Sequence, residues 1–222
     1  MEICTSHYNE DLEWLHESEF PVTVIGHEGE APHTFKNSHV IPNLGYELSS
    51  YLYFILTRWD TLPEFTVFLH GHENAWHQKG QESLLERIRR ANTGKYKYIP
   101  LNNMYVSKFF VGQCEFGKKI IEIFKHMYGR DIPHHVFMPM SNQCIVHTSL
   151  IKKYPKDMYE NLYNFILSMN QSDSHTCADT GDILFTLLYS NLKCVPHDLI
   201  FYPREDFFDP PLDQPFILYD VV

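Results

Sequence analysis

The sequence has no apolar run long enough to cross a membrane. The longest run extends from Tyr51 to Leu56, far short of the ~18 residues that a membrane-spanning helix needs. The basic and apolar segments of a secretory signal peptide are also missing, because the acidic residues Glu2, Glu10 and Asp11 lie where those segments would stand. These absences predict a protein without a membrane span and favour a cytoplasmic location.

Basic residues and paired cysteines are scarce as well. The chain carries 18 Lys and Arg against 28 Asp and Glu, so its formal net charge is −10. A nucleic-acid backbone needs a basic surface, and we therefore predict no nucleic-acid partner. The five cysteines include no Cys-x-x-Cys pair, and their mostly apolar neighbours predict buried, reduced thiols.

Hydrophobic residues make up 44% of the chain, and their pattern predicts an α/β fold. Short strand-like segments alternate with segments whose apolar residues have helical spacing. This alternation predicts a central, mostly parallel sheet flanked by helices, as in Rossmann-like proteins. The strand-like segments are 3–6, 21–26 and 65–69, and the helical ones are 10–17, with Asn9 as its cap, and 44–56.

The sequence predicts a single domain over residues 1–222, because no repeat or low-complexity tract divides it. Residues 27–42 are expected to form a loop, and the proline-rich residues 203–222 an irregular tail. The remaining predicted helices are 82–92, 116–128, 156–169 and 181–190, and the remaining strands are 104–111, 135–139 and 143–147.

Polar residues follow each of the first three predicted strands. In open parallel sheets, ligands bind beyond the carboxyl ends of the strands, so these residues are candidates for a binding site. The three sets are Thr5-Ser6-His7-Tyr8, Gly26-His27-Glu28 and His70-Gly71-His72-Glu73.

The third set is the densest cluster of chemically active side chains. His70 and His72 point the same way if the strand geometry continues, and Glu73 adds a carboxylate. Imidazole and carboxylate together suit Mn²⁺, Zn²⁺ or Fe²⁺ better than Mg²⁺, so His70, His72 and Glu73 are the predicted metal ligands. The alternative is a solvent-facing polar loop.

A second motif, Asn43-Leu44-Gly45-Tyr46-Glu47, opens the longest predicted helix. A helix N-terminus presents free N–H groups and a partial positive charge, which suit a phosphate or a sugar hydroxyl. The alternative is an ordinary helix start with a turn glycine.

Several segments resemble a fungal and viral family of proteins similar to GT-A glycosyltransferases. The matching segments are Cys4 to Leu15, the Asn43-x-Gly45-x-Glu47 motif with Tyr51 and Leu52, Leu62 to Leu69, Cys144 to His147, and Lys153 to Tyr159. Within that family, the chain is similar to the amino-terminal glycosyltransferase domain of chlorovirus capsid-glycan proteins. The resemblance covers most of residues 3–190.

The resemblance implies a GT-A fold, a UDP-sugar donor and a divalent cation, Mn²⁺ in the first place. It also implies transfer of a hexose or a deoxyhexose such as rhamnose to a glycan or glycoprotein acceptor, in the host cytoplasm, by one domain of a longer protein. His70 and His72 stand where such enzymes carry an Asp-x-Asp motif, which is absent here.

The same resemblance implies a role for each of the remaining candidate residues. Asp179 or Asp182, which precede a late helix, would face the acceptor as catalytic residues, unless they only cap that helix. The residues that would hold the uridine, the ribose and the donor side are Thr5, Ser6, His7, Tyr8, Asn43, Gly45, Glu47 and Tyr51.

Two other functions use the same features. A metal-dependent hydrolase built on the histidine cluster predicts tightly bound metal and no nucleotide binding. A non-enzymatic carbohydrate-binding module would use the aromatic residues, which make up 15% of the chain, and predicts glycan binding that needs neither metal nor UDP.

Overall fold

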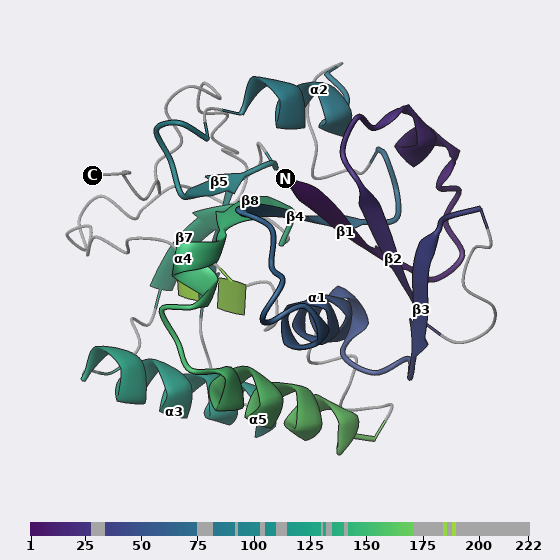
Figure 1. Cartoon of the computed structure of the whole chain (residues 1–222). Helices are drawn as coiled ribbons and strands as arrows, with labels where there is room; N and C mark the ends of the chain where they lie inside the picture. Colours follow the sequence, from purple (N-terminus) through teal and green to yellow (C-terminus); the bar gives the residue numbers. More distant parts are fainter. Residues whose placement is uncertain are drawn as a thin grey trace.

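A computed structural model of the chain describes residues 1–27, 34–74, 82–91, 93–102, 105–109, 115–129, 131, 135–139, 142–170, 184–185 and 188–189 (Figure 1). Its main element is a six-stranded sheet with the strand order β3-β2-β1-β4-β8-β5. The strands are β1 (Glu2–His7), β2 (Val22–His27), β3 (Asn37–Ile41), β4 (Phe65–His70), β5 (Tyr98–Pro100) and β8 (Cys144–His147).

Four neighbouring strands, β3, β2, β1 and β4, are parallel to one another, and β8 is antiparallel to both of its neighbours. The described part of the chain therefore has the predicted α/β fold, a mostly parallel sheet flanked by helices. The register pairs Ser6 of β1 with Ile25 of β2 and with His70 of β4. The carboxyl ends of these strands thus meet at one edge of the sheet.

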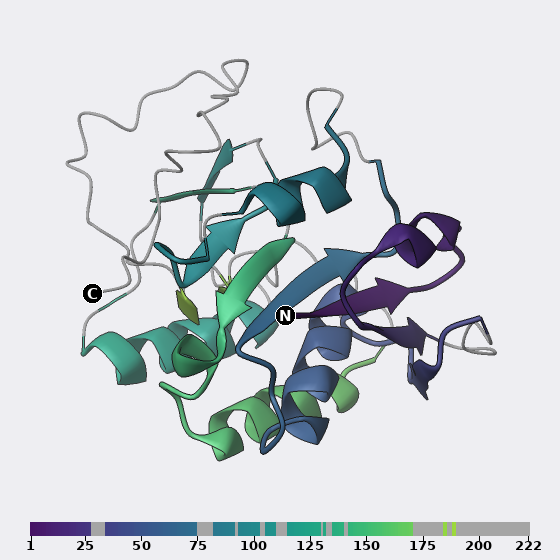
Figure 2. The same cartoon turned by 45° about the horizontal axis from the view of Figure 1, so that its top comes forward.

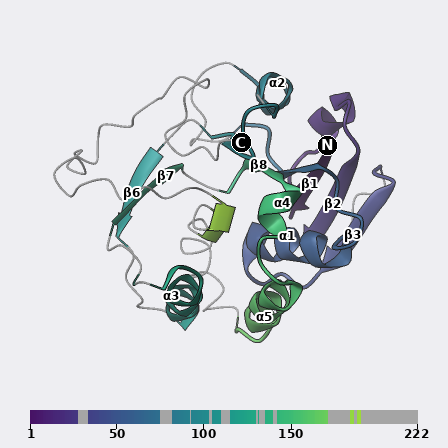
Figure 3. The same cartoon turned by 60° about the vertical axis from the view of Figure 1, so that its left-hand side comes forward.

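Helices cover both faces of this sheet (Figure 2). They are the 3₁₀ helix η1 (Glu13–Glu17) and the α-helices α1 (Tyr46–Thr57), α2 (Leu84–Arg90), α3 (Glu115–Tyr128), α4 (Thr148–Ile151) and α5 (Lys156–Leu167). Two further strands, β6 (Tyr105–Phe109) and β7 (His135–Pro139), form a separate antiparallel pair away from the main sheet (Figure 3).

Alternate residues of β1, β2, β4, β5 and β8 enter two different cores. Cys4 and Phe68 pack with α1, α4 and α5, whereas Ile3 and Val67 pack with η1 and α2. This period of two is the expected consequence of strand geometry in a sheet covered on both faces. It explains why the strand segments are almost continuously apolar.

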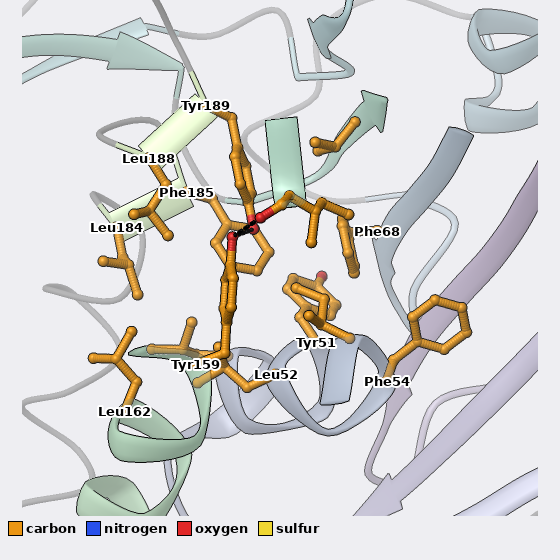
Figure 4. Close-up of a cluster of buried hydrophobic side chains, with 14 of the residues drawn as sticks. Tyr51, Leu52, Phe54, Phe68, Tyr159, Leu162, Leu184, Phe185, Leu188 and Tyr189 are labelled. Atoms are coloured by element: carbon orange, nitrogen blue, oxygen red, sulfur yellow. Dashed lines mark hydrogen bonds between the residues drawn. The ribbon is translucent and has the colours of Figure 1, made fainter. Parts of the chain in front are cut away.

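Aromatic rings fill the core on the α1 side (Figure 4). Tyr51 lies 4.9 Å from Phe68 and 5.5 Å from Phe185, measured between ring centroids. The Tyr159 hydroxyl donates to the carbonyl of Ile151 at 2.8 Å and lies 3.3 Å from the Tyr189 hydroxyl. The pKa of Tyr159 is raised by burial. The aromatic residues on this side therefore form core rather than a surface for stacking.

Two local predictions are wrong. The segment 10–17 forms only the 3₁₀ helix η1, which starts after Leu12 and has no side-chain cap from Asn9. Asp11 instead accepts the backbone N–H of Glu13 at 2.9 Å. The predicted loop 27–42 contains the edge strand β3, which pairs with β2. Only one residue of β3, Ile41, is buried, so this strand has no alternation of apolar and polar residues in its sequence.

The other predicted helices and strands of the described ranges are present within a few residues of their predicted ends. The tail 203–222 lies outside the described residues, and only 184–185 and 188–189 of the predicted helix 181–190 are described, as helical. Cys4 and Cys144 are buried free thiols, as expected. In the described ranges, no helix is long and apolar enough to cross a membrane.

Candidate functional site

A cavity of about 480 Å³ lies at the carboxyl ends of β1 and β4. The chain leaves these two neighbouring strands toward opposite edges of the sheet. It continues to β2 after β1, and to β5 and then β8 after β4. Ligands of open α/β sheets bind at such a switch point. The described residues that line the cavity are Ser6, Tyr8, Glu10, His27, Asn43, Tyr46, Glu47, His70, Gly71 and His72.

Six of the predicted site residues meet in this cavity although they come from three separate parts of the sequence. They are Ser6, Tyr8, Asn43, Glu47, His70 and His72. Tyr8 is 51% exposed, so its ring is available to a ligand at the cavity.

Within the described ranges, five predicted site residues are not among those that line the cavity: Thr5, His7, Gly45, Tyr51 and Glu73. Thr5 is buried and donates to the carbonyl of His70 at 3.2 Å, and a ring nitrogen of His7 lies 3.2 Å from the carbonyl of Glu10. Tyr51 belongs to the aromatic core. Glu73 is half-buried. Asp179 and Asp182, the predicted catalytic residues, lie outside the described residues.

Gly45 also does not line the cavity. It is the N-cap residue of α1 and has a φ of +74°. A Cβ atom at this position would clash with Cγ2 of Ile166 on α5. The glycine is therefore required by its backbone conformation and by the close packing of α5. Its predicted role in ligand binding is not needed to explain its presence.

Imidazoles and a carboxylate form one wall of the cavity. Nε2 of His70 lies 3.8 Å from Oε1 of Glu47, and the rings of His70 and His72 are 5.2 Å apart at 86°. The backbone N–H of His70 donates to Gln143 Oε1 at 3.2 Å, and Gln143 donates to Asn102 at 3.0 Å. Because Gln143 and Asn102 are buried, they fix the end of β4.

Glu10 closes the cavity on the β1 side. Its carboxylate accepts the backbone N–H groups of Tyr8 at 2.6 Å and Asn9 at 3.2 Å. Burial lowers the pKa of His72, and the nearby charge of Glu10 opposes this shift. The His72 imidazole is therefore neutral at neutral pH, as a metal ligand or a proton acceptor must be.

The loop after β4 is fastened to the same region. The Trp14 ring N–H donates to the carbonyl of Gly71 at 3.1 Å. A Cβ atom on Gly71 would lie 2.7 Å from Oε2 of Glu10 and 3.0 Å from the carbonyl of Ser6. Only glycine allows the loops after β1 and β4 to approach this closely.

A buried polar network forms the floor of the cavity. Ser50 donates from its hydroxyl to the Ser6 hydroxyl at 3.0 Å. Nε2 of His27 lies 2.8 Å from the Ser50 oxygen and 3.1 Å from the Ser6 oxygen. Sequence reasoning identified Ser6 but not Ser50, because a serine inside a helix carries no signal of a site. His27 follows a strand, and that position was its only signal.

The amino end of α1 also borders the cavity. Tyr46 starts the helix with a φ of 50°, which is uncommon outside glycine, and the helix has no side-chain cap. Burial raises the pKa of the Tyr46 hydroxyl, and the Glu47 carboxylate raises it further. The hydroxyl therefore stays protonated at neutral pH and is able to donate a hydrogen bond.

A divalent cation has ligands of the right kind here, although they are not assembled. In the described ranges, no group of three or more His, Cys, Asp or Glu side chains is arranged to hold a metal ion. Two ligands of one ion at bonds of ~2.1 Å are at most ~4.2 Å apart. The 3.8 Å between His70 and Glu47 fits this limit, so these two side chains can share a cation. The predicted metal ligands were His70, His72 and Glu73. The structure places Glu47, which was predicted on the donor side, beside His70, and Glu73 is not among the residues that line the cavity.

The chain belongs to the family described as "Protein of unknown function (DUF3431)", whose model matches residues 3–197. The matched range contains every described residue that lines the cavity. No curated protein and no solved structure matches the chain.

Proposed function

We propose that this member of the DUF3431 family is a metal-dependent, GT-A-like glycosyltransferase that transfers a hexose or a deoxyhexose from a UDP-sugar to a glycan or glycoprotein acceptor. One observation supports this most. Residues expected on the donor side (Ser6, Tyr8, Asn43 and Glu47) and the two histidines at the Asp-x-Asp position line one cavity at the switch point of the sheet.

The chemistry of the cavity supports a sugar and a cation. Its described lining contains two carboxylates, Glu10 and Glu47, and neither Lys nor Arg. Carboxylates accept hydrogen bonds from sugar hydroxyls, but they repel a bare diphosphate. A diphosphate therefore needs an accompanying cation to enter, which favours a nucleotide-sugar bound together with a metal ion.

In this proposal, His70 and Glu47 hold the cation, with His72 as a further ligand. When bound, the cation would neutralise the charge that develops on the leaving diphosphate. The Tyr46 hydroxyl donates a hydrogen bond to the donor, and the exposed ring of Tyr8 stacks on a base or a sugar. Asp179 and Asp182 remain the proposed residues on the acceptor side.

The proposal is tested by thermal unfolding with and without UDP, crossed with Mn²⁺, Mg²⁺ and EDTA. We expect the midpoint to rise only when UDP and Mn²⁺ are both present, because the diphosphate needs the cation to bind. A ligand at 100 times its Kd stabilises the folded state by about 2.7 kcal/mol. Glu47→Gln should lose most of this rise. Glu160→Gln, which removes a half-exposed carboxylate from α5, is the matched control and should keep it.

Other outcomes contradict the transferase. A large loss of stability on chelation with no response to UDP supports a hydrolase. No response to metal or UDP supports a carbohydrate-binding module. If UDP and Mn²⁺ together stabilise the protein, UDP release from a panel of UDP-sugars then identifies the donor.

A further inference from the structure

Both backbone polar groups of His70 are held by buried side chains. The hydroxyl of Thr5 donates to the His70 carbonyl at 3.2 Å, and Oε1 of Gln143 accepts the His70 N–H at 3.2 Å. Thr5 lies on β1 and Gln143 immediately precedes β8, and these two strands flank β4 on opposite sides. The last residue of β4 is therefore fastened by side chains from both neighbouring strands.

The contact with Gln143 lies beyond the end of the backbone pairing between β4 and β8. The last paired residues of these two strands are Phe68 and Cys144, and His70 lies two residues further along β4. A side chain rather than the β8 backbone therefore supplies the acceptor for the His70 N–H. This contact ties down a strand end that the pairing with β8 no longer reaches.

Both holding side chains are themselves fixed in place. Thr5 and Gln143 are 0% and 1% exposed. Because a backbone N–H can only donate, the amide oxygen of Gln143 must face His70, and the amide nitrogen then donates to Oδ1 of Asn102 at 3.0 Å. The single hydroxyl proton of Thr5 has a second acceptor within reach, the carbonyl of Ser6, but this is the more distant one at 3.5 Å.

Strand geometry sets the direction in which the His70 ring points. Leu69 is buried in the core with η1 and α2, so the next residue, His70, projects toward the opposite face, which α1 covers. Glu47 lies on α1, and its Oε1 is 3.8 Å from Nε2 of His70. Thr5 and Gln143 are not among the described residues that line the cavity, so they reach this site only through the backbone of His70.

The distance between His70 and Glu47 leaves little room for error. Two ligand atoms of one cation are at most ~4.2 Å apart, and the observed separation is 3.8 Å. A displacement of the end of β4 by less than an ångström is therefore enough to prevent the two side chains from sharing an ion. Contacts that fix the backbone of His70 act directly on this distance.

We infer that Thr5 and Gln143 are positioning residues, which hold His70 by its backbone at the distance from Glu47 that a shared divalent cation requires. The inference rests on the proposed function, in which His70 and Glu47 hold the cation. It gives Thr5 a role that differs from the predicted one, contact with the uridine or ribose. It also gives a role to Gln143, which no sequence motif identified.

The test measures the affinity for Mn²⁺ by calorimetric titration in the presence and absence of UDP. Replacing a residue that orients a metal ligand commonly weakens metal binding 10- to 100-fold. We therefore expect Thr5→Val, which keeps the size of the side chain and removes its hydroxyl, to weaken Mn²⁺ binding about tenfold or more. Thr5→Ser, which keeps the hydroxyl, should retain most of the affinity.

Gln143→Met tests the other contact independently. It removes the acceptor of the His70 N–H and should weaken Mn²⁺ binding to a similar extent. It should also speed the hydrogen exchange of the His70 amide, which NMR measures in the protein without metal. Either of the two variants carries the test if the other does not fold.

Two control variants separate positioning from a general loss of stability. Thr66 is a buried threonine of the same strand, and its hydroxyl has no hydrogen-bond partner among the described residues, so Thr66→Val should keep the affinity for Mn²⁺. Ile88→Ala removes core contacts on α2 and lowers stability without touching His70. It should bind Mn²⁺ as the unchanged protein does at a temperature where both are folded.

Two kinds of result overturn the inference, and they differ in what they say of the function. If the unchanged protein binds Mn²⁺, and Thr5→Val and Gln143→Met bind it equally well or lose no more than the two controls do, these residues are only structural and the proposed function stands. If the unchanged protein binds no Mn²⁺ with or without UDP, the proposed function fails and the inference fails with it.

Discussion

Glu10 and Gly71 meet where the loop after β1 touches the loop after β4. The Glu10 carboxylate is held by the N–H groups of Tyr8 and Asn9, so it cannot move away without losing two hydrogen bonds. The carbonyl of Ser6 limits the space at Gly71 from the other side. The missing Cβ atom at Gly71 therefore leaves the space in which the Glu10 carboxylate and the loop after β4 lie against each other.

We expect Gly71→Ala to lower the free energy of unfolding by about 1–3 kcal/mol, the usual cost of overpacking. It should also weaken the binding of UDP with Mn²⁺, because the loops must separate. Urea unfolding and calorimetric titration measure the two effects. Adding Glu10→Ala should restore part of the stability, since it removes the clash with the carboxylate. An unchanged midpoint in Gly71→Ala would show that the loops adapt freely.

His147 connects two elements, since it ends β8 and caps α4. Its Nδ1 accepts the backbone N–H of Ser149 at 3.0 Å, which requires an unprotonated nitrogen. Burial lowers the pKa of His147, Lys97 lowers it further, and Glu64 opposes both. The folded protein therefore binds a proton at this ring less readily than the unfolded chain does.

The sign of the pH dependence follows from this difference. Below the ordinary pKa of 6.5, the unfolded chain binds more protons at His147 than the folded protein does, so the free energy of unfolding decreases as the pH falls. His147→Asn keeps a capping side chain and removes the titration. Urea unfolding at pH 7.5 and at pH 5.5 should show a smaller decrease for this variant. Equal decreases in the two proteins would contradict a titrating cap.

The motif Asn43-x-Gly45-x-Glu47 serves two purposes at the start of α1. Asn43 and Glu47 line the cavity, whereas Gly45 allows the turn into the helix and the close approach of Ile166. The hypothesis of a ligand-binding helix start and the alternative of an ordinary turn glycine therefore each describe part of the motif. Sequence alone could not separate them, because α5 is more than a hundred residues away along the chain.

At the scale of the whole molecule, one sheet joins two hydrophobic cores. Leu162 of α5 lies in the core with α1, and Ile88 of α2 lies in the core on the opposite face. Residues on β1 and β4 alternate between these cores. Loss of either core therefore removes the support of the same strands, and the two faces should unfold together.

We expect Leu162→Ala and Ile88→Ala each to lower the free energy of unfolding by about 2–5 kcal/mol and to shift one common transition. Calorimetry gives the number of transitions, and circular dichroism at far and near ultraviolet wavelengths checks that secondary and tertiary structure are lost together. Two separate transitions in either variant would show that the faces are independent.

The sequence by itself determined most of the strands and helices of the main sheet and most of one wall of the site. Hydrophobic periodicity is a local property, so the strands β1, β2 and β4 and the helices α1 and α5 could be predicted from short windows. The ends of parallel strands meet at one edge, so the residues after β1 and β4 could be placed together before any contact was known. Ser6, Tyr8, His70 and His72 were found in this way.

Only the tertiary structure decided which other residues Ser6, Tyr8, His70 and His72 contact. The strand β3 is an exposed edge whose pairing depends on β2, and its sequence has no apolar alternation. The Glu10 carboxylate accepts backbone N–H groups of its own loop, and the Ser50 hydroxyl donates to the side chain of Ser6 on another element. Burial removes water as a partner for such groups, so their roles depend on distances between segments far apart in the chain, which no local pattern encodes.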